Sequence, residues 1–246
     1  MPVGIEALRS VVVLAGQDER VLDRINTASS LLHAQPEMTI LRAGDPPASV
    51  MFLLTGHVLL RRPGGAEADI IDVLEAARPL CLGALFGLPE TADIVALGTA
   101  RLIVTPAATL RALVRTESRL AEALLAFAVH AMRGLERDLE AVKLRPAAQR
   151  LGAYLLELAG SGAASPAIVA LPYFKQTLAA RIGCTQENLS RAFARLRTLG
   201  VESQREFVTI ADVDALKAFV GPTPAPDPSF AAVAAAELGP GVAPGE

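Results

Sequence analysis

The stretch from Lys175 to Leu199, KQTLAARIGCTQENLSRAFARLRTL, constrains the fold more than any other part of the chain. Apolar residues recur at helical spacing on both sides of Gly183, which predicts two short helices joined by a tight turn. Ala179 lies one helical turn before Gly183, and Leu189 lies in the second helix. A small residue lets the helices approach, glycine permits a positive φ at the turn, and leucine anchors the second helix on the first. This spacing predicts a helix-turn-helix.

Other residues of this stretch fit the same interpretation. Thr185 is placed to cap the second helix with its hydroxyl, and Gly200 is placed to end it. The residues predicted to fill the shared core are Leu178, Ile182, Ala192, Phe193 and Leu196. After Gly200, the segments Val201–Ser203 and Phe207–Ile210 flank Gln204-Arg205-Glu206, which predicts a two-stranded wing. An ordinary helical hairpin in some other fold is the alternative.

The second helix is predicted to project Gln186, Glu187, Ser190 and Arg191 from its first two turns. In a helix-turn-helix this end of the second helix enters the major groove of DNA. Arginine pairs with guanine through two hydrogen bonds, glutamate accepts from cytosine, glutamine pairs with adenine, and serine is permissive. The pattern therefore predicts base-reading residues and double-stranded DNA as the partner.

Local charge supports this prediction, although the whole chain is acidic, with a net charge of −3. Between Lys175 and Arg205 there are six basic residues against two acidic ones. DNA binding depends on such local charge rather than on the average of the chain. Lys175, Arg195 and Arg197 are predicted to contact phosphates, which position a protein without reading sequence.

The rest of the chain predicts two further regions. The first thirty-odd residues have mixed helical spacing, with Leu22, Ile25, Leu31 and Leu32 on an apolar face. From Met38 to about Val104, short apolar runs alternate with turn residues, which predicts a compact β-roll or barrel with a short helical turn at Gly83–Pro89. The short apolar runs are Met51–Leu54, Val58–Leu60, Ile70–Leu74 and Leu102–Val104.

A long helix is predicted from Ser118 to Arg145, where the sequence has no proline. Apolar residues recur at intervals of three and four, with Asp138 as a polar interruption, and this favours a dimerisation seam. The seam residues are Leu120, Leu124, Phe127, Ala131, Leu135 and Val142. The alternative is a helix that packs on its own domain. Pro146 predicts a hinge, because proline cannot continue a helix interior.

These observations predict an α+β chain with four parts. They are a β-roll sensor domain over residues 1–117, a dimerisation helix over 118–145, a winged helix-turn-helix over 146–221, and a disordered tail over 222–246. The tail is rich in proline, alanine and glycine. We expect a cytoplasmic protein without a membrane segment, because the N-terminus lacks a signal-peptide pattern and the two cysteines form no disulfide framework. No arrangement of catalytic residues is recognisable, so an enzyme is not predicted.

From Met38 to Val220 the sequence resembles the Crp/Fnr family of bacterial transcription regulators. The likeness lies in Gly44, Gly56 and Gly83 at turn positions of the roll, in the long helix, and above all in Gly183–Arg191, GCTQENLSR. Within it, Glu187, Ser190 and Arg191 are similar to the E-x-x-S-R signature of the Fnr-like branch. The resemblance implies a homodimer, a palindromic site resembling TTGAT-N4-ATCAA, and contact with RNA polymerase.

The sensor half departs from the family pattern. Where cyclic-nucleotide binders have Gly-Glu-Leu, this chain has Gly83-Ala84-Leu85, and Glu90 stands before Thr91 where they have a phosphate-binding arginine. A carboxylate there repels a phosphate, so cyclic AMP is not expected as the effector. The chain also lacks the N-terminal cysteine cluster of an iron–sulfur sensor.

Cys81 lies near the position where a haem-binding relative carries its thiolate ligand, which leaves haem and gas sensing as an alternative. Candidate effector-binding residues are Cys81, Gly83, Leu85 and Thr91. A structural role for Cys81, redox control through Cys184, and a regulator with no effector also remain open.

Overall fold

The computed structural model describes residues 3–46, 48–64, 69–160, 162–172, 175–204 and 206–222, with the backbone alone described at Lys175 and Gln176. These residues form two compact units that divide within one long helix, between Met132 and Arg133. The predicted tail, apart from Pro222, lies outside the described residues, as does Arg205.

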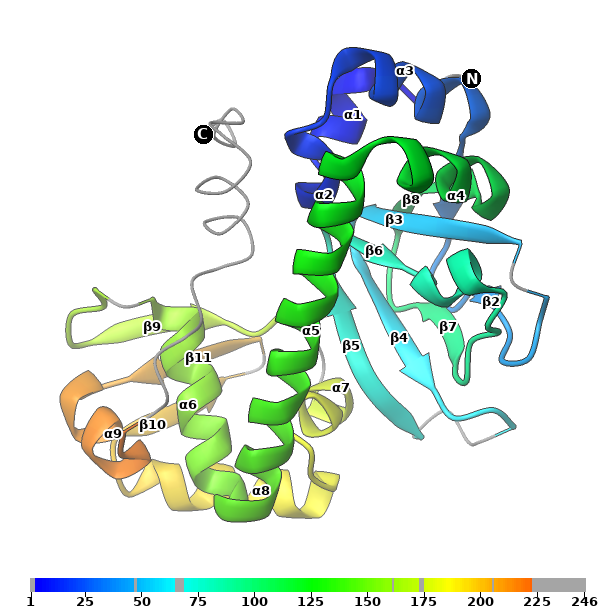
Figure 1. Cartoon of the computed structure of the whole chain (residues 1–246). Coiled ribbons are helices and arrows are strands. Elements are labelled where there is room, and N and C mark those ends of the chain that lie inside the picture. The colour runs from blue at the N-terminus through cyan, green and yellow to red at the C-terminus, as the bar shows by residue number, and fades with distance from the viewer. Residues whose placement is uncertain are drawn as a thin grey trace. The chain divides into compact units, whose positions relative to one another are not determined.

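The first unit is built on two antiparallel sheets, with strand orders β1-β8-β3-β6 and β2-β7-β4-β5 (Figure 1). The first sheet consists of β1 (Ser30–Ala34), β8 (Ala100–Pro106), β3 (Ser49–Thr55) and β6 (Arg78–Leu80). The second consists of β2 (Thr39–Leu41), β7 (Asp93–Ala96), β4 (His57–Arg61) and β5 (Ile70–Glu75). The short helix η1 (Leu82–Phe86) follows β6, at the predicted helical turn.

Helices cover the outer face of the first sheet. They are α1 (Ile5–Arg9), α2 (Val12–Ala15), α3 (Glu19–Ala28), α4 (Ala107–Thr116) and the start of α5 (Ser118–Leu144). Because successive side chains of β3 point to opposite faces, Val50 and Phe52 pack against these helices, whereas Met51 and Leu53 pack between the sheets. Burial on both faces explains the unbroken apolar run of this strand.

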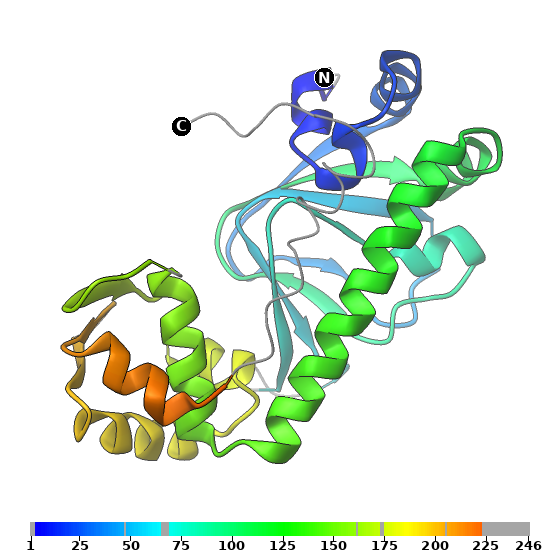
Figure 2. The same cartoon turned by 60° about the vertical axis from the view of Figure 1, so that its left-hand side comes forward.

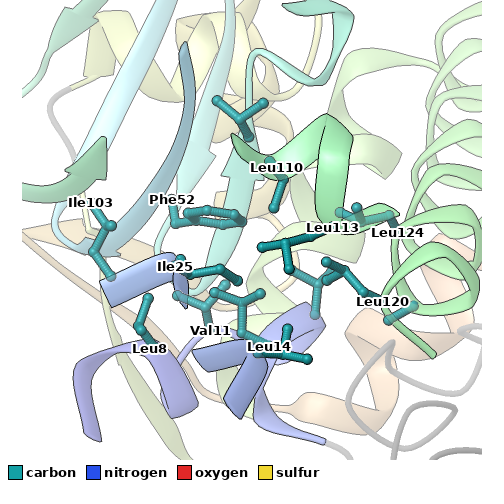
Figure 3. Packing of buried hydrophobic residues seen from close by; sticks show 14 of the residues in the cluster. Leu8, Val11, Leu14, Ile25, Phe52, Ile103, Leu110, Leu113, Leu120 and Leu124 are labelled. Carbon is teal, nitrogen blue, oxygen red and sulfur yellow. The ribbon is translucent and has the colours of Figure 1, made fainter. Parts of the chain in front are cut away.

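Figure 3 shows the cluster between the sheet and the helices. Phe52 and Ile103 reach it from the sheet, and Leu14 and Ile25 reach it from the N-terminal helices. All four are fully buried. The cluster therefore fastens the N-terminal helices and the first turns of α5 to the roll.

The structure corrects the predicted start of the roll. Leu31 and Leu32 do not continue an N-terminal helix, because α3 ends at Ala28 and these residues pair in β1 with Ile103 and Leu102 of β8. Their apolar spacing was compatible with a helix, and a strand far along the chain determines their conformation. The roll consequently begins at Ser30 rather than near Met38.

The second unit contains the last turns of α5 and a helical domain with a small sheet (Figure 2). Its further helices are α6 (Ala147–Ala159), α7 (Lys175–Arg181), α8 (Gln186–Arg197) and α9 (Val213–Val220). Its sheet has the order β10-β11-β9, with β9 (Ala167–Ala170), β10 (Val201–Gln204) and β11 (Phe207–Ile210). The predicted two-stranded wing is confirmed and gains a third strand, β9. None of the helices within the described ranges is long and apolar enough to cross a membrane.

Candidate nucleic-acid interface

Helix α8 has one buried and one exposed face. Leu189, Ala192 and Leu196 are buried in the second unit. The Thr185 hydroxyl accepts a hydrogen bond from the Asn188 amide at 3.2 Å, so the predicted N-cap is present. Phe193 is only partly buried, in contrast to the prediction. The cap determines where the helix begins, and the buried face determines which side chains point outward.

The predicted base-reading residues Gln186, Glu187, Ser190 and Arg191 all lie on the exposed face of α8. Arg191 and Glu187 form an ion pair of 2.6 Å between Nη2 and Oε1, and the Ser190 hydroxyl donates to the Gln186 carbonyl at 3.0 Å. Both charged side chains are 74% exposed, so water screens the pair and it stabilises the fold little. Their polar groups remain accessible to base edges.

The turn before α8 is tightly packed. Gly183 has φ of +67°, and a Cβ atom there would lie 2.8 Å from Cγ2 of Val142. Ala179 is buried, and its carbonyl accepts from the Cys184 amide at 2.9 Å. Glycine is therefore required both by the backbone conformation and by the approach of α5. Burial raises the pKa of the Cys184 thiol, an effect partly opposed by the Arg150 guanidinium.

The predicted phosphate contacts have different surroundings. Arg197 is exposed on the last turn of α8. The Arg195 guanidinium lies over the Phe219 ring, 5.8 Å from its centre, so this side chain also joins α8 to α9. The side chain of Lys175 lies outside the described residues.

A hollow of about 430 Å³ lies beside the exposed face of α8. Its lining residues are Ala147, Ala148, Arg150, Asn188, Arg191 and Ala192. Of its two guanidinium groups, that of Arg191 pairs with Glu187 and that of Arg150 donates to backbone carbonyls. Asn188 and the start of α6 could not be assigned to this site from sequence, because only the tertiary fold brings α6 beside α8.

Of the candidate effector residues, only Cys81 lines the small cavity found in the first unit. Cys81 and Leu85 are buried, and Thr91 is exposed. A Cβ atom on Gly83 would lie 3.0 Å from the Leu88 carbonyl oxygen. The cavity beside Cys81 measures about 10 Å³, with Glu90, Asp45 and Ser49 among its lining residues.

Electrostatics at this cavity oppose a thiolate. Burial raises the pKa of the Cys81 thiol to about 12, and the neighbouring Glu90 carboxylate adds to the shift. Burial also raises the pKa of the Glu90 carboxyl group. Within the described residues, no group of three or more histidine, cysteine, aspartate or glutamate side chains is arranged to hold a metal ion.

Two family models match the chain, one for each unit. Residues 31–117 match the cyclic nucleotide-binding domain, and residues 149–219 match the Crp-like helix-turn-helix domain. The two matches together cover more than half of the chain, in the order that the fold shows. The chain belongs to the Crp/Fnr family. It is a DNA-binding transcription regulator of the Crp/Fnr type.

The chain is similar over most of its length to solved structures of the same fold. FixK2 from Bradyrhizobium japonicum has 18% identity and a TM-score of 0.64, with 80% of this chain and 99% of that chain covered. A CooA mutant from Carboxydothermus hydrogenoformans has 16% identity and a TM-score of 0.68, covering 86% and 95%. A CRP/FNR-family transcriptional regulator from Thermus thermophilus has 21% identity and a TM-score of 0.58, covering 79% and 100%. A comparison with curated proteins finds no match.

The cavity beside Cys81 in this Crp/Fnr-family regulator suits neither a cyclic nucleotide nor haem. Pockets for ligands of such size measure roughly 300–1,000 Å³, whereas the cavity beside Cys81 measures about 10 Å³. Glu90 lines this cavity with a carboxyl group, whereas proteins bind a phosphate with cationic side chains. The protonated, buried Cys81 thiol is likewise a poor ligand for haem iron.

The long helix of this regulator places the predicted seam residues in two different environments. Leu120 and Leu124 are buried in the cluster with the N-terminal helices, and Phe127 packs partly buried against the same cluster. Figure 3 shows Leu120 and Leu124 beside Leu113. Ala131 is half-buried, whereas Leu135 and Val142 are exposed. The first half of the predicted seam thus faces its own unit.

Proposed function

We propose that this Crp/Fnr-type regulator binds, as a homodimer, a palindrome resembling TTGAT-N4-ATCAA. Gln186, Glu187, Ser190 and Arg191 read the bases of each half-site, and Arg197 with Lys175 contacts phosphates. The observation that carries the proposal is the exposure of these four polar side chains on the first two turns of a capped helix. Contact with RNA polymerase is a further expectation from the family resemblance.

We propose that the dimer seam on α5 runs from Leu125 to Val142 and keeps only Leu135 and Val142 of the predicted seam. Leu125, Met132 and Leu139 are exposed apolar residues spaced by seven, and Ala128, Leu135 and Val142 repeat the same spacing between them. Together they form an uninterrupted heptad stripe, which is the pattern of two helices packed side by side. The polar Asp138 then falls outside the seam. A second copy of this chain is the occupant that such a self-complementary stripe fits.

The base-reading role is tested with Arg191→Ala. Fluorescence anisotropy would measure binding to a labelled duplex with the palindrome and to a duplex with a scrambled sequence. Loss of a pair of hydrogen bonds to a base costs about 1–3 kcal/mol at each half-site, so affinity for the palindrome falls at least tenfold towards that for scrambled DNA.

Arg24→Ala is the matched control, because Arg24 is exposed on α3 in the other unit. This variant should bind the palindrome like the wild type. Unchanged preference for the palindrome in Arg191→Ala would refute the proposed reading of bases.

A further inference from the structure

One arginine joins three segments of the second unit. Arg150, near the start of α6, donates to the carbonyl of Arg145 at 2.6 Å and more weakly to that of Val142 at 3.5 Å. It also donates to the carbonyls of Ile182 at 2.7 Å and Gly183 at 2.9 Å. The first two carbonyls belong to the end of α5 and its exit, and the last two belong to the turn before α8.

The chemistry of these acceptors explains why arginine suits the position. Carbonyls at the end of a helix have no partner within the helix and carry partial negative charge. A guanidinium presents several donors in one rigid plane and can satisfy acceptors on several sides at once. A lysine ammonium has the same charge but not this fork.

Neighbouring contacts reinforce the same junction. Arg181 of α7 pairs with Asp138 of α5 at 3.7 Å. A Cβ atom on Gly183 would lie 2.8 Å from Cγ2 of Val142, so α5 and this turn are in close contact. Contacts from α6 and from α7 therefore stabilise the junction at Pro146, where the sequence predicted a hinge.

From these contacts we infer that Arg150 is a positioning residue for DNA recognition, which locks the last turns of α5 and the turn before α8 into one rigid body. The orientation of α8 relative to the last turns of α5 is then fixed, and the chain does not bend at Pro146. In a dimer held along α5, this lock determines the separation and orientation of the two recognition helices. The inference rests on the proposed function, because it assumes that a dimer reads two half-sites.

Spacing discrimination is the readout that separates positioning from simple contact with DNA. We would measure affinity for the palindrome with its four-base-pair spacer, for spacers one base pair shorter and longer, and for a single half-site. Adding one base pair shifts and rotates one half-site relative to the other, which a rigid dimer resists. The wild type should prefer the four-base-pair spacer by about tenfold or more, which is about 1.4 kcal/mol.

Arg150→Gln should reduce this preference to about threefold or less, while affinity for the single half-site stays within about twofold. Arg150→Lys should behave like Arg150→Gln, because charge without the fork does not join the carbonyls. Arg197→Gln is the control for a phosphate-binding side chain. It should weaken binding to every site and lower the salt dependence of log affinity by about 1 for each phosphate that Arg197 neutralises, with spacing preference intact.

Full spacing preference in Arg150→Gln would overturn the inference, as would rescue by Arg150→Lys or a drop in salt dependence like that of Arg197→Gln. Hydrogen exchange of the wild-type chain provides a test that needs no variant and no DNA. Amides from Val142 to Arg145, with those of Gln149 and Arg150, should exchange as slowly as those in the middle of α6, and fast exchange there would refute the lock. If the wild type does not prefer the palindrome over scrambled DNA, the proposed function is wrong. Hydrogen exchange alone then tests whether Arg150 locks the junction.

Discussion

Cys81 adopts a left-handed backbone conformation, with φ of +59°, at the start of η1. Few residues other than glycine adopt this conformation without cost, and surrounding packing must hold it in place. The side chain is buried beside Glu90, and both burial and that carboxylate raise the pKa of its thiol to about 12. The residue thus combines a strained backbone with an unreactive thiol.

These properties predict the order in which the two cysteines react. Iodoacetamide attacks the thiolate, so at pH 8 it should modify the half-buried Cys184 first and reach Cys81 only when the chain unfolds. Mass spectrometry of the alkylated chain would locate the labels, and Cys184→Ser should abolish labelling under native conditions. Rapid native labelling of Cys81 would contradict the prediction.

The same pKa shift links stability to pH. The unfolded thiol ionises near its ordinary value of 9.0, whereas the folded thiol keeps its proton until about 12. The contribution of Cys81 is therefore fully present below pH 9 and is lost as the pH rises towards 12. Urea unfolding of Cys81→Ala should show a weaker decline in stability over this interval than the wild type.

Among the elements, the passage of the chain from β3 in one sheet to β4 in the other depends on Gly56. Gly56 has φ of +86°, and a Cβ atom there would collide with the Thr99 carbonyl oxygen and lie 3.0 Å from Cα of Ala100. Gly44 has a similar φ of +81° with nothing within 4 Å. Comparing the two glycines therefore separates the free-energy cost of a positive φ from the cost of a collision between Cβ and the Thr99 carbonyl.

Gly56→Ala should lower the free energy of unfolding by about 2–5 kcal/mol, because strain and overpacking add. Gly44→Ala should lower it by only about 1–2 kcal/mol. Chemical denaturation monitored by circular dichroism would measure both values. Equal losses in the two variants would show that the Thr99 carbonyl moves aside without cost.

The helix-turn-helix was predictable from sequence because its determinants are local. Gly183 adopts the positive φ that the turn needs, and Thr185 caps a helix that begins at the next residue. The register of α5 was not predictable, because N-terminal helices distant in sequence cover Leu120 and Leu124. The role of Arg150 was equally hidden, since its acceptors are backbone carbonyls that any sequence would supply.

The register of the seam on α5 is open to a direct test. Leu139 is 54% exposed and belongs only to the heptad stripe proposed from the structure. Leu139→Glu should place two charges against each other in a dimer and yield monomers in sedimentation equilibrium, with an unchanged melting temperature of the monomer. Arg133→Glu, exposed on another face of the same helix, should remain dimeric. A dimeric Leu139→Glu would exclude this register.

Regulation of the whole chain requires that an effector distinguish two of its conformational states. A ligand shifts such an equilibrium only by the difference between its affinities for the two states. The roll has the architecture of a cyclic nucleotide-binding domain, but its cavity of about 10 Å³ and the Glu90 carboxyl group do not suit a cyclic phosphate. The first unit thus combines the fold of a cyclic nucleotide-binding domain with a small cavity lined by a carboxyl group.

The expected outcome is that cyclic AMP affects neither stability nor DNA binding. A ligand present at one hundred times its dissociation constant stabilises the folded state by about 2.7 kcal/mol, which a melting curve detects readily. With millimolar cyclic AMP, the melting temperature should therefore stay unchanged, and affinity for the palindrome should change less than about twofold. A higher melting temperature together with tighter DNA binding would show that the roll opens to admit the nucleotide and that Glu90 does not repel it. A higher melting temperature with unchanged DNA affinity would show that the nucleotide binds but does not affect α8. The prediction about binding would then be wrong, and the prediction about DNA affinity would be right.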